Sequence, residues 1–200
     1  KTYIAAPEHR SLFPASLHEN WTQIISDSGP DWFDELPRLN RLSDPSIMSK
    51  LYRAMEEKQA IQIQYTSMTT GKDMGQWIMP THFASDGARI HLRAFSFKHD
   101  EYRDYVPVRI GSRSSFKKRS PEVELPIDID WETVARIYLV PKNGLTRDQV
   151  KAVRREYGFK DKLLCIETRK ALEFYADRRW GLDQQNARLE KHSTEYIQLY

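Results

Sequence analysis

A series of short alternating segments in the first half of the chain constrains the fold most. In the first segment, Ile61, Ile63 and Tyr65 alternate with polar residues, which is the period of a strand with one buried face. Asp86-Gly87 is a dipeptide typical of the two-residue turns that join hairpin strands. The expected strands cover residues 61–65, 76–83, 88–97 and 102–110. Because strands joined by short turns pair antiparallel, this region predicts a small β-barrel.

A helix is predicted directly before these strands. Asp44 suits the N-cap position, because its side chain can accept a hydrogen bond from a free backbone N–H group. Pro45 suits the first helical position, where its missing N–H costs nothing. Apolar residues then recur at helical spacing from Ile47 to Met55. A helix followed by several strands is therefore expected in this part of the chain.

The last 80 residues show a different pattern, in which strands and helices alternate. Thr146 and Gln149 have the spacing of a capping box, and Gly158 suits the left-handed position after a helix. Thr168 is expected to cap a second helix that ends at Gly181. The expected elements are strands over 134–140, 163–166 and 196–199 and helices over 146–157 and 168–181. This βαβαβ order predicts a small α+β sandwich with its helices on one face of a sheet.

These patterns divide the chain into three predicted parts. Residues 1–43 are expected to be a helical connector, with a short helix over 16–25. Residues 44–120 are expected to form the small barrel, and Pro121 marks the start of the α+β region at 121–200. The predicted fold class is therefore α+β.

Cysteine content and charge limit the possible classes of protein. The single cysteine, Cys165, lies in the apolar run 163–166 and is expected to be buried, so we predict a cytoplasmic protein without an intrachain disulfide. The net charge of +3 does not by itself indicate nucleic-acid binding. The basic cluster from Arg109 to Arg119 is either a local phosphate-binding segment or a solvated turn.

Membrane insertion is not expected. No stretch approaches the ~20 consecutive apolar residues that a membrane helix requires. The sequence starts at Lys1 without a signal-peptide pattern and without Met, so we expect the N-terminus of the protein to lie upstream.

Motifs of common catalytic sites are absent from the sequence. No glycine-rich phosphate loop, no nucleophile elbow and no His-Glu-x-x-His run occurs, and the six histidines are scattered. We therefore predict a protein that is not an enzyme, with no catalytic residues, no metal and no cofactor.

The polar residues of the middle strands indicate a binding site. Residues two apart on a strand share a face, so His91 and Arg93 should project together. On the next strand, Arg103, Tyr105 and Arg109 are separated by even numbers of residues and should likewise share a face. The residues expected to converge are Tyr65, Ser67, His82, His91, Arg93, Arg103 and Arg109. Such a set suits a phosphate or nucleotide, because arginine binds phosphate through two hydrogen bonds and rings can stack on bases.

Two other interpretations are open. Arginines on half-exposed strands are usually solvated or paired with a carboxylate, here Asp104 or Glu101, and His82 can be a structural residue. The barrel would then be a protein–protein interaction module without a small-molecule or nucleic-acid ligand. Salt dependence separates these interpretations, because phosphate binding weakens steeply as salt rises.

The middle region resembles the WYL domain of bacterial transcription regulators. The segments that carry the resemblance are 61–67, 79–82, 89–95, 102–105 and 108–110. The match is closest to the phage-defence regulators BrxR and CapW, in which a His-Val-Arg-Ala type strand replaces the Trp-Tyr-Leu triplet. Here Ile90 stands where the triplet has Trp, which fits that subgroup. The segments 145–149, 156–158, 169–175 and 182–183 resemble the WCX extension that follows WYL domains.

The resemblance implies a fold and a function. The WYL domain would be an Sm-like (SH3-like) barrel that binds a nucleic acid or nucleotide effector, and the WCX domain would contribute to a homodimer. An N-terminal winged helix, expected upstream of this chain, would bind operator DNA, and the regulator would repress a phage-defence operon. By position, the seven residues expected to converge also fall on the family's pocket motifs. Arg93, Arg103 and Arg109 would hold the phosphates, while Tyr65 and His91 would stack or form hydrogen bonds.

Overall fold

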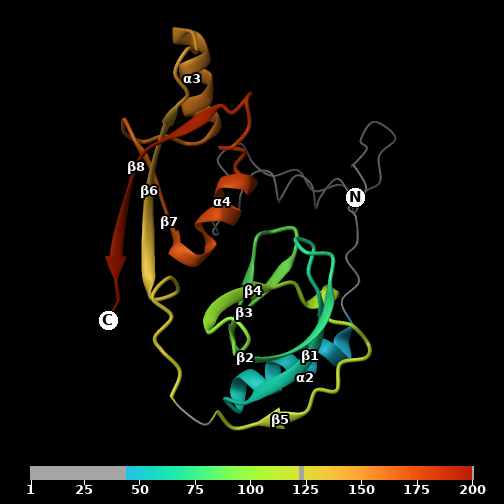
Figure 1. Ribbon diagram of the computed structural model, residues 1–200. Helices are drawn as coiled ribbons and strands as arrows, with labels where there is room; N and C mark the ends of the chain where they lie inside the picture. The colour runs from blue at the N-terminus through green and yellow to red at the C-terminus, as the bar shows by residue number, and fades with distance from the viewer. Residues whose placement is uncertain (1–43, 122–123, 200) are drawn as a thin grey trace, which may run out of the picture. The chain divides into compact units, whose positions relative to one another are not determined.

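The computed structural model describes residues 44–121 and 124–199, so the predicted connector at 1–43 lies outside the described residues. An antiparallel five-stranded sheet has the strand order β4-β3-β2-β1-β5 (Figure 1). Its elements are helix α2 (Pro45–Glu56), strands β1 (Ala60–Thr66), β2 (Asp73–Ser85), β3 (Ile90–Ser96) and β4 (Glu101–Tyr105), the 3₁₀ helix η1 (Pro107–Arg109) and β5 (Lys118–Arg119). The predicted helix and hairpins of this region are confirmed.

Helix α2 begins where the sequence predicts. The Asp44 side chain accepts a hydrogen bond of 2.8 Å from the amide of Ser46, and Pro45 is the first helical residue. The buried residues Leu51 and Ala54 lie on one side of the helix and belong to the core beneath the sheet. That core also contains Ile61, Ile63, Ile78, Leu92, Ala94 and Tyr105. The alternation seen in the sequence thus fills one face of the sheet.

The last predicted strand of this region, 102–110, is too long. Strand β4 ends at Tyr105, and Pro107 opens the short helix η1. Proline has no N–H to donate to a strand ladder, and its fixed φ suits a helical turn. The chain then returns to β1 through an isolated bridge between Tyr65 and Ile110.

A closed barrel is not found in the described part of the chain. The sheet has two edge strands, β4 and β5, and no ladder joins them in residues 44–121. Strand β5 has only two residues, which pair with Ala60 and Ile61. The fold is α+β with antiparallel sheets, while the Sm-like barrel remains a prediction.

A second antiparallel sheet has the strand order β7-β6-β8. Its elements are β6 (Thr133–Pro141), α3 (Arg147–Glu156), β7 (Leu164–Arg169), the 3₁₀ helix η2 (Lys170–Leu172), α4 (Glu173–Arg179) and β8 (Leu189–Gln198). Its core contains Ala135, Ile137, Leu139, Val153 and Leu189, with Leu164, Ile166 and Trp180 packed against it. None of the described helices is long and apolar enough to cross a membrane.

The caps of helix α3 are confirmed. The amide of Thr146 donates to Gln149 Oε1 at 2.8 Å, and the amide of Gln149 donates to Thr146 Oγ1 at 3.3 Å. Gly158 has a φ of 68°, the left-handed conformation expected after the helix.

Three predictions for this region are wrong in detail. Cys165 is exposed, because alternation along β7 turns Leu164 and Ile166 toward the core and Cys165 away from it. Thr168 is not an N-cap, because β7 pairs with β6 as far as Arg169 and α4 begins only at Glu173. The last strand starts at Leu189 rather than at residue 196, because β6 offers a partner along its whole length.

Candidate functional site

The strand register divides the seven predicted site residues between two faces. Arg93 lies opposite Asp104 in the β3–β4 ladder, so Asp104 points to the same side as Arg93. Arg103 and Tyr105 therefore point to the other side, and Tyr105 belongs to the core. The predicted convergence of Arg93 with Arg103 is wrong. The register between β3 and β4 decides which β4 side chains share a face with Arg93, and the sequence does not show this register.

A β-bulge in β2 moves His82 to the face of Arg93. The register shifts between Pro80 and His82, and Thr81 Oγ1 donates to the carbonyl of Arg93 at 3.1 Å. The His82 ring stacks on Trp131, with 4.2 Å between ring centroids and 19° between planes. Burial lowers the pKa of His82. A neutral, stacked imidazole fits the structural role that the sequence left open for this residue.

Arg93 is held by two carboxylates. Its Nε and Nη2 donate to the two oxygens of Asp128 at 2.7 and 2.9 Å, and its Nη1 donates to Asp104 at 3.2 Å. Burial alone would lower the pKa of Arg93, but the bonds to Asp128 and the charge of Asp104 raise it, so the guanidinium stays charged. Arg93 thus ties the first sheet to the segment that leads into the second, and its hydrogen-bonding groups are engaged.

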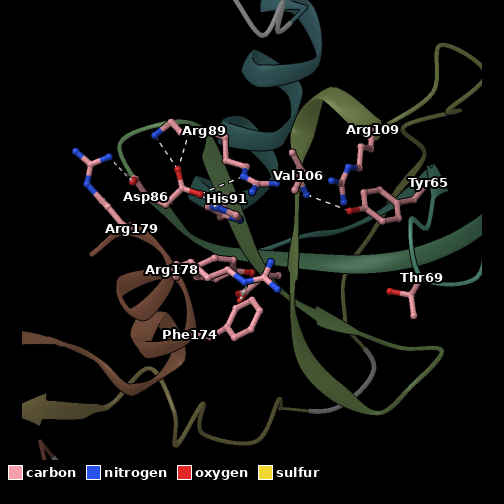
Figure 2. Close-up of a pocket in the computed structure, with 13 residues that line it drawn as sticks. Tyr65, Thr69, Asp86, Arg89, His91, Val106, Arg109, Phe174, Arg178 and Arg179 are labelled. Carbon is pink, nitrogen blue, oxygen red and sulfur yellow. Dashed lines mark hydrogen bonds and ion pairs between the residues drawn. The ribbon is translucent and has the colours of Figure 1, made fainter. Parts of the chain in front are cut away.

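Beside this ion pair lies a cavity of about 560 Å³ (Figure 2). Both sheet regions contribute to it: residues of β1, β3, β4 and η1 on one side, and residues of α4 on the other. The lining residues are Tyr65, Thr69, Asp86, Ala88, Arg89, His91, Asp104, Val106, Arg109, Phe174, Tyr175, Arg178 and Arg179. The set contains four arginines and only two carboxylates.

The two carboxylates of the cavity are already engaged. Asp86 accepts hydrogen bonds from His91 Nε2 at 2.9 Å and from the amides of Ala88 and Arg89 at 2.8 and 2.7 Å. Burial alone would raise the pKa of Asp86, but these bonds hold it well below its usual range. Asp104 accepts from Arg93 and from the Tyr175 hydroxyl at 3.1 Å. An incoming anion therefore meets few unpaired negative charges.

The four arginines differ in how they are held. Arg89 pairs with Asp86 at 3.1 Å, and Arg179 donates to the carbonyl of Asp86 at 3.0 Å. Arg178 is 62% exposed, lies over the Phe174 ring at 4.4 Å from its centroid, and forms only a long ion pair of 3.9 Å with the exposed Asp183. Arg109 forms no ion pair with any carboxylate in residues 44–121 or 124–199. Arg109 and Arg178 are thus the guanidinium groups most available to a ligand.

Aromatic rings line the cavity on both sides. The Tyr65 hydroxyl accepts from the amide of Val106 at 3.2 Å, which fixes the ring beside η1. Phe174 on α4 is 57% exposed. The Tyr175 ring lies 4.1 Å from the imidazole of His91 and joins α4 to β3. Exposed ring surface beside guanidinium groups is a combination that can bind a base and its phosphate.

A second cavity of about 510 Å³ adjoins the first and shares Tyr65, Thr69, Asp104 and Arg109 with it. Ser67 and Arg103 line this second cavity, and Arg103 pairs with Glu101 at 3.3 Å. Of the seven predicted residues, Tyr65, His91 and Arg109 line the first cavity. His82 and Arg93 line neither cavity.

Sequence reasoning missed every other residue of the first cavity, including Arg89, Phe174, Tyr175, Arg178 and Arg179. Arg89 lies two residues after the predicted Asp86-Gly87 turn and two residues before the predicted site residue His91, and this position was a signal that could have identified it. Arg179 approaches Gly87 so closely that a Cβ there would lie 2.2 Å from its Nη1. The α4 residues are about 90 positions away along the chain, so only the packing of the two regions brings them to the site.

The depressed pKa of Asp86 predicts an acid-dependent stability. A carboxyl whose pKa is lower in the folded state stabilises that state above its ordinary pKa of about 4, and the stabilisation is lost as pH falls below that value. We expect Asp86→Asn to be less stable than the parent at pH 7 and to lose less unfolding free energy between pH 5 and pH 3. Urea unfolding across this range measures the effect. Asp148→Asn, which removes an exposed partner of Lys151, should keep the parental dependence; equal slopes for all three proteins would contradict the prediction.

No group of three or more histidine, cysteine, aspartate or glutamate side chains that could hold a metal ion occurs in the residues that the structure describes. The donors of the cavity are guanidinium groups, an imidazole and hydroxyls, which suit an anion.

Comparison with known proteins gives a consistent result. Residues 134–199 match the family model of the BrxR transcriptional regulator, C-terminal dimerization domain. The DNA-binding transcriptional repressor CapW of Escherichia coli (strain KTE188) is 32% identical over 141 residues, which are 70% of this chain and 46% of that protein. The chain is thus similar to regulators of the BrxR/CapW type. The resemblance to these regulators seen in the sequence is thereby confirmed, while the WYL and WCX assignments stay predictions.

Two further relatives carry the same description as the E. coli repressor. CapW of Stenotrophomonas maltophilia is 29% identical over 72% of this chain and 48% of its own length. CapW of Pseudomonas aeruginosa is 25% identical over 88% of this chain and 62% of its own length. This chain thus spans about half the length of the curated relatives it matches. A solved structure, the proteasome accessory factor B/C (PafBC) of Arthrobacter aurescens, aligns with 82% of this chain over 27% of its own chain, with a TM-score of 0.36 and 11% sequence identity.

Proposed function

We propose that this chain is the ligand-binding and dimerising region of a bacterial DNA-binding transcription repressor, and that its first cavity binds a nucleotide or a nucleic acid. The relatives are described as DNA-binding transcriptional repressors, and the matching family domain is a dimerization domain. The WYL and WCX assignments, and control of a phage-defence operon, follow from the resemblance described above.

One observation carries the ligand proposal: four arginines and three aromatic rings surround a cavity whose two carboxylates are already engaged. Arginine binds phosphate through parallel hydrogen bonds, and an aromatic ring provides a stacking surface for any base. Arg109 and Arg178 approach from opposite walls and would contact phosphates, while Tyr65 and Phe174 would contact a base. The volume of about 560 Å³ lies in the usual range for small-molecule sites.

The position of the cavity supports a switching mechanism. Its two walls are joined by the hydrogen bonds of Tyr175 to Asp104 and of Arg179 to the Asp86 carbonyl. A ligand that bridges Arg109 and Arg178 would favour one arrangement of these walls, and it shifts the equilibrium only if it binds the two arrangements with different affinity. The change would reach operator DNA through the winged helix that the resemblance places ahead of these residues, because the spacing of two recognition helices must match the half-sites.

Salt dependence tests the ligand proposal. We expect a 5′-phosphorylated thymidine trinucleotide to bind the chain, as measured by titration calorimetry at 50 and 200 mM salt. If two phosphates are contacted, the affinity should fall about sevenfold between these concentrations, since each phosphate of a single strand contributes about 0.7 to the logarithmic slope.

Two outcomes would contradict the proposal. The first is no binding at 50 mM salt, and the second is binding whose affinity does not change with salt. Either result favours the alternative, in which this region is a protein–protein interaction module without a nucleic-acid ligand.

A further inference from the structure

We infer that one face of the second sheet, here called the open face, is the surface on which a second copy of this chain packs. The inference rests on the dimerising role in the proposed function and adds the location of the contact. The open face consists of side chains that point away from the core of the second sheet: Val134, Arg136, Tyr138 and Val140 on β6, Cys165 and Glu167 on β7, and Glu195 and Ile197 on β8.

The opposite face of this sheet is already covered within the chain. Ala135, Ile137 and Leu139 of β6 are at most 1% exposed and pack with Val153 of α3. Alternation along the strands then places the neighbours of these residues on the open face. Among the described residues, neither α3 nor α4 supplies a core residue to the open face, since every member of the second core lies on the covered side.

The open face carries apolar residues at the end where β8 finishes. Val134 is opposite Ile197 in the β6–β8 ladder, and Ile197 is 37% exposed. Leu199, two residues beyond Ile197, is 53% exposed. Burying exposed apolar surface of this kind against a partner removes it from water and stabilises the complex.

The charged residues at the centre of the open face are compatible with burial, because they are paired within the chain. Arg136 Nε donates to Glu167 Oε1 at 2.7 Å across β6 and β7. The Tyr138 hydroxyl donates to Glu195 Oε2 at 3.1 Å across β6 and β8. A partner surface therefore meets side chains whose polar groups already have acceptors or donors.

A second copy is the occupant that fits these observations. The family model for a dimerization domain matches 134–199, which contains all three strands of the open face. A twofold dimer places the same patch of each subunit against itself, and two sheets that pack face to face lie about 10 Å apart. The covered side is filled by its own helices, so the open face is the sheet surface left for the partner.

Substitution of Ile197 tests this assignment in the 200-residue chain. We expect Ile197→Lys to raise the dissociation constant of the dimer about tenfold or more in sedimentation equilibrium, because it places a charge of each copy in the apolar end of the contact. Tyr157→Lys is the matched control: Tyr157 is 38% exposed and caps α3 on the covered side, so its dimer should dissociate like the parent.

The single cysteine provides an independent measurement on the folded protein. Cys165 lies on the open face, so its reaction with Ellman's reagent should be slowed in the dimer and should speed up on dilution. In Ile197→Lys the fast rate should persist at concentrations where the parent is dimeric. A parental dimer that Ile197→Lys leaves intact, or whose Cys165 reacts equally fast at all concentrations, would overturn the open-face assignment. A parent that is monomeric throughout would instead contradict the dimerising role itself.

Discussion

Arg93→Ala should lower the free energy of unfolding by about 3–5 kcal/mol, the largest stability effect that we expect for a single substitution. The guanidinium of Arg93 is the partner of Asp128 and a partner of Asp104, and the side chains of Arg93 and Asp128 are 9% and 8% exposed. Removing it leaves two carboxylates in a poorly hydrated position without a compensating charge. Urea unfolding followed by tryptophan fluorescence measures the loss.

Arg103→Ala provides the matched control. Arg103 is an arginine of the adjacent strand that also pairs with a carboxylate, but Arg103 and Glu101 are 46% and 58% exposed. An exposed ion pair contributes at most about 1 kcal/mol, so this variant should be close to the parent. The double variant Arg93→Leu with Asp128→Ala should recover part of the loss, because it also removes the Asp128 carboxylate that Arg93→Ala leaves without a compensating charge. Equal destabilisation by Arg93→Ala and Arg103→Ala would show that Arg93 does not have the role described here.

Arg109→Ala should weaken binding of the thymidine trinucleotide about 10- to 100-fold with little change in stability. Arg109 lines both cavities and has no carboxylate partner within the described residues, so its hydrogen-bonding groups are available to a phosphate. A hydrogen bond to a charged group is worth about 1.5–3 kcal/mol, which corresponds to this range of affinity. The salt dependence of binding should also become shallower, because one fewer phosphate is neutralised.

Arg113→Ala distinguishes a built site from general basic charge. Arg113 belongs to the same basic cluster of the sequence, but its side chain is 84% exposed and pairs with Asp73 outside the first cavity. We expect this variant to bind the trinucleotide like the parent. Equal losses in the two variants would mean that the ligand is attracted by the basic segment as a whole, and the cavity would lose its role.

The local features of the fold could be predicted from the sequence because their causes are local. The N-cap at Asp44, the Asp86-Gly87 turn and the capping box of Thr146 depend on neighbouring residues alone. Features that depend on distant partners could not be predicted. Strand β7 continues past Thr168 because β6 offers a partner there, and this pairing overrides the capping preference of threonine.

The candidate site shows the same limit. Tyr65, His91 and Arg109 were predicted from the character of their strands and from the resemblance, and all three line the cavity. Alternation within one strand says nothing about its register to the next, so the opposite faces of Arg93 and Arg103 could not be foreseen. The contribution of α4 depends on the packing of two regions, which leaves no pattern in either segment.

The most direct measurement is a nuclear magnetic resonance titration of the chain with the thymidine trinucleotide, recorded on backbone amides and on the arginine Nε–H groups. The central claim is that arginines of both cavity walls contact one ligand. We therefore predict the largest shifts for Arg109 and Arg178 together, with smaller shifts at Tyr65 and Phe174 and none at Arg113. Shifts confined to the exposed basic segment around Arg113, or to one wall of the cavity alone, would contradict the account.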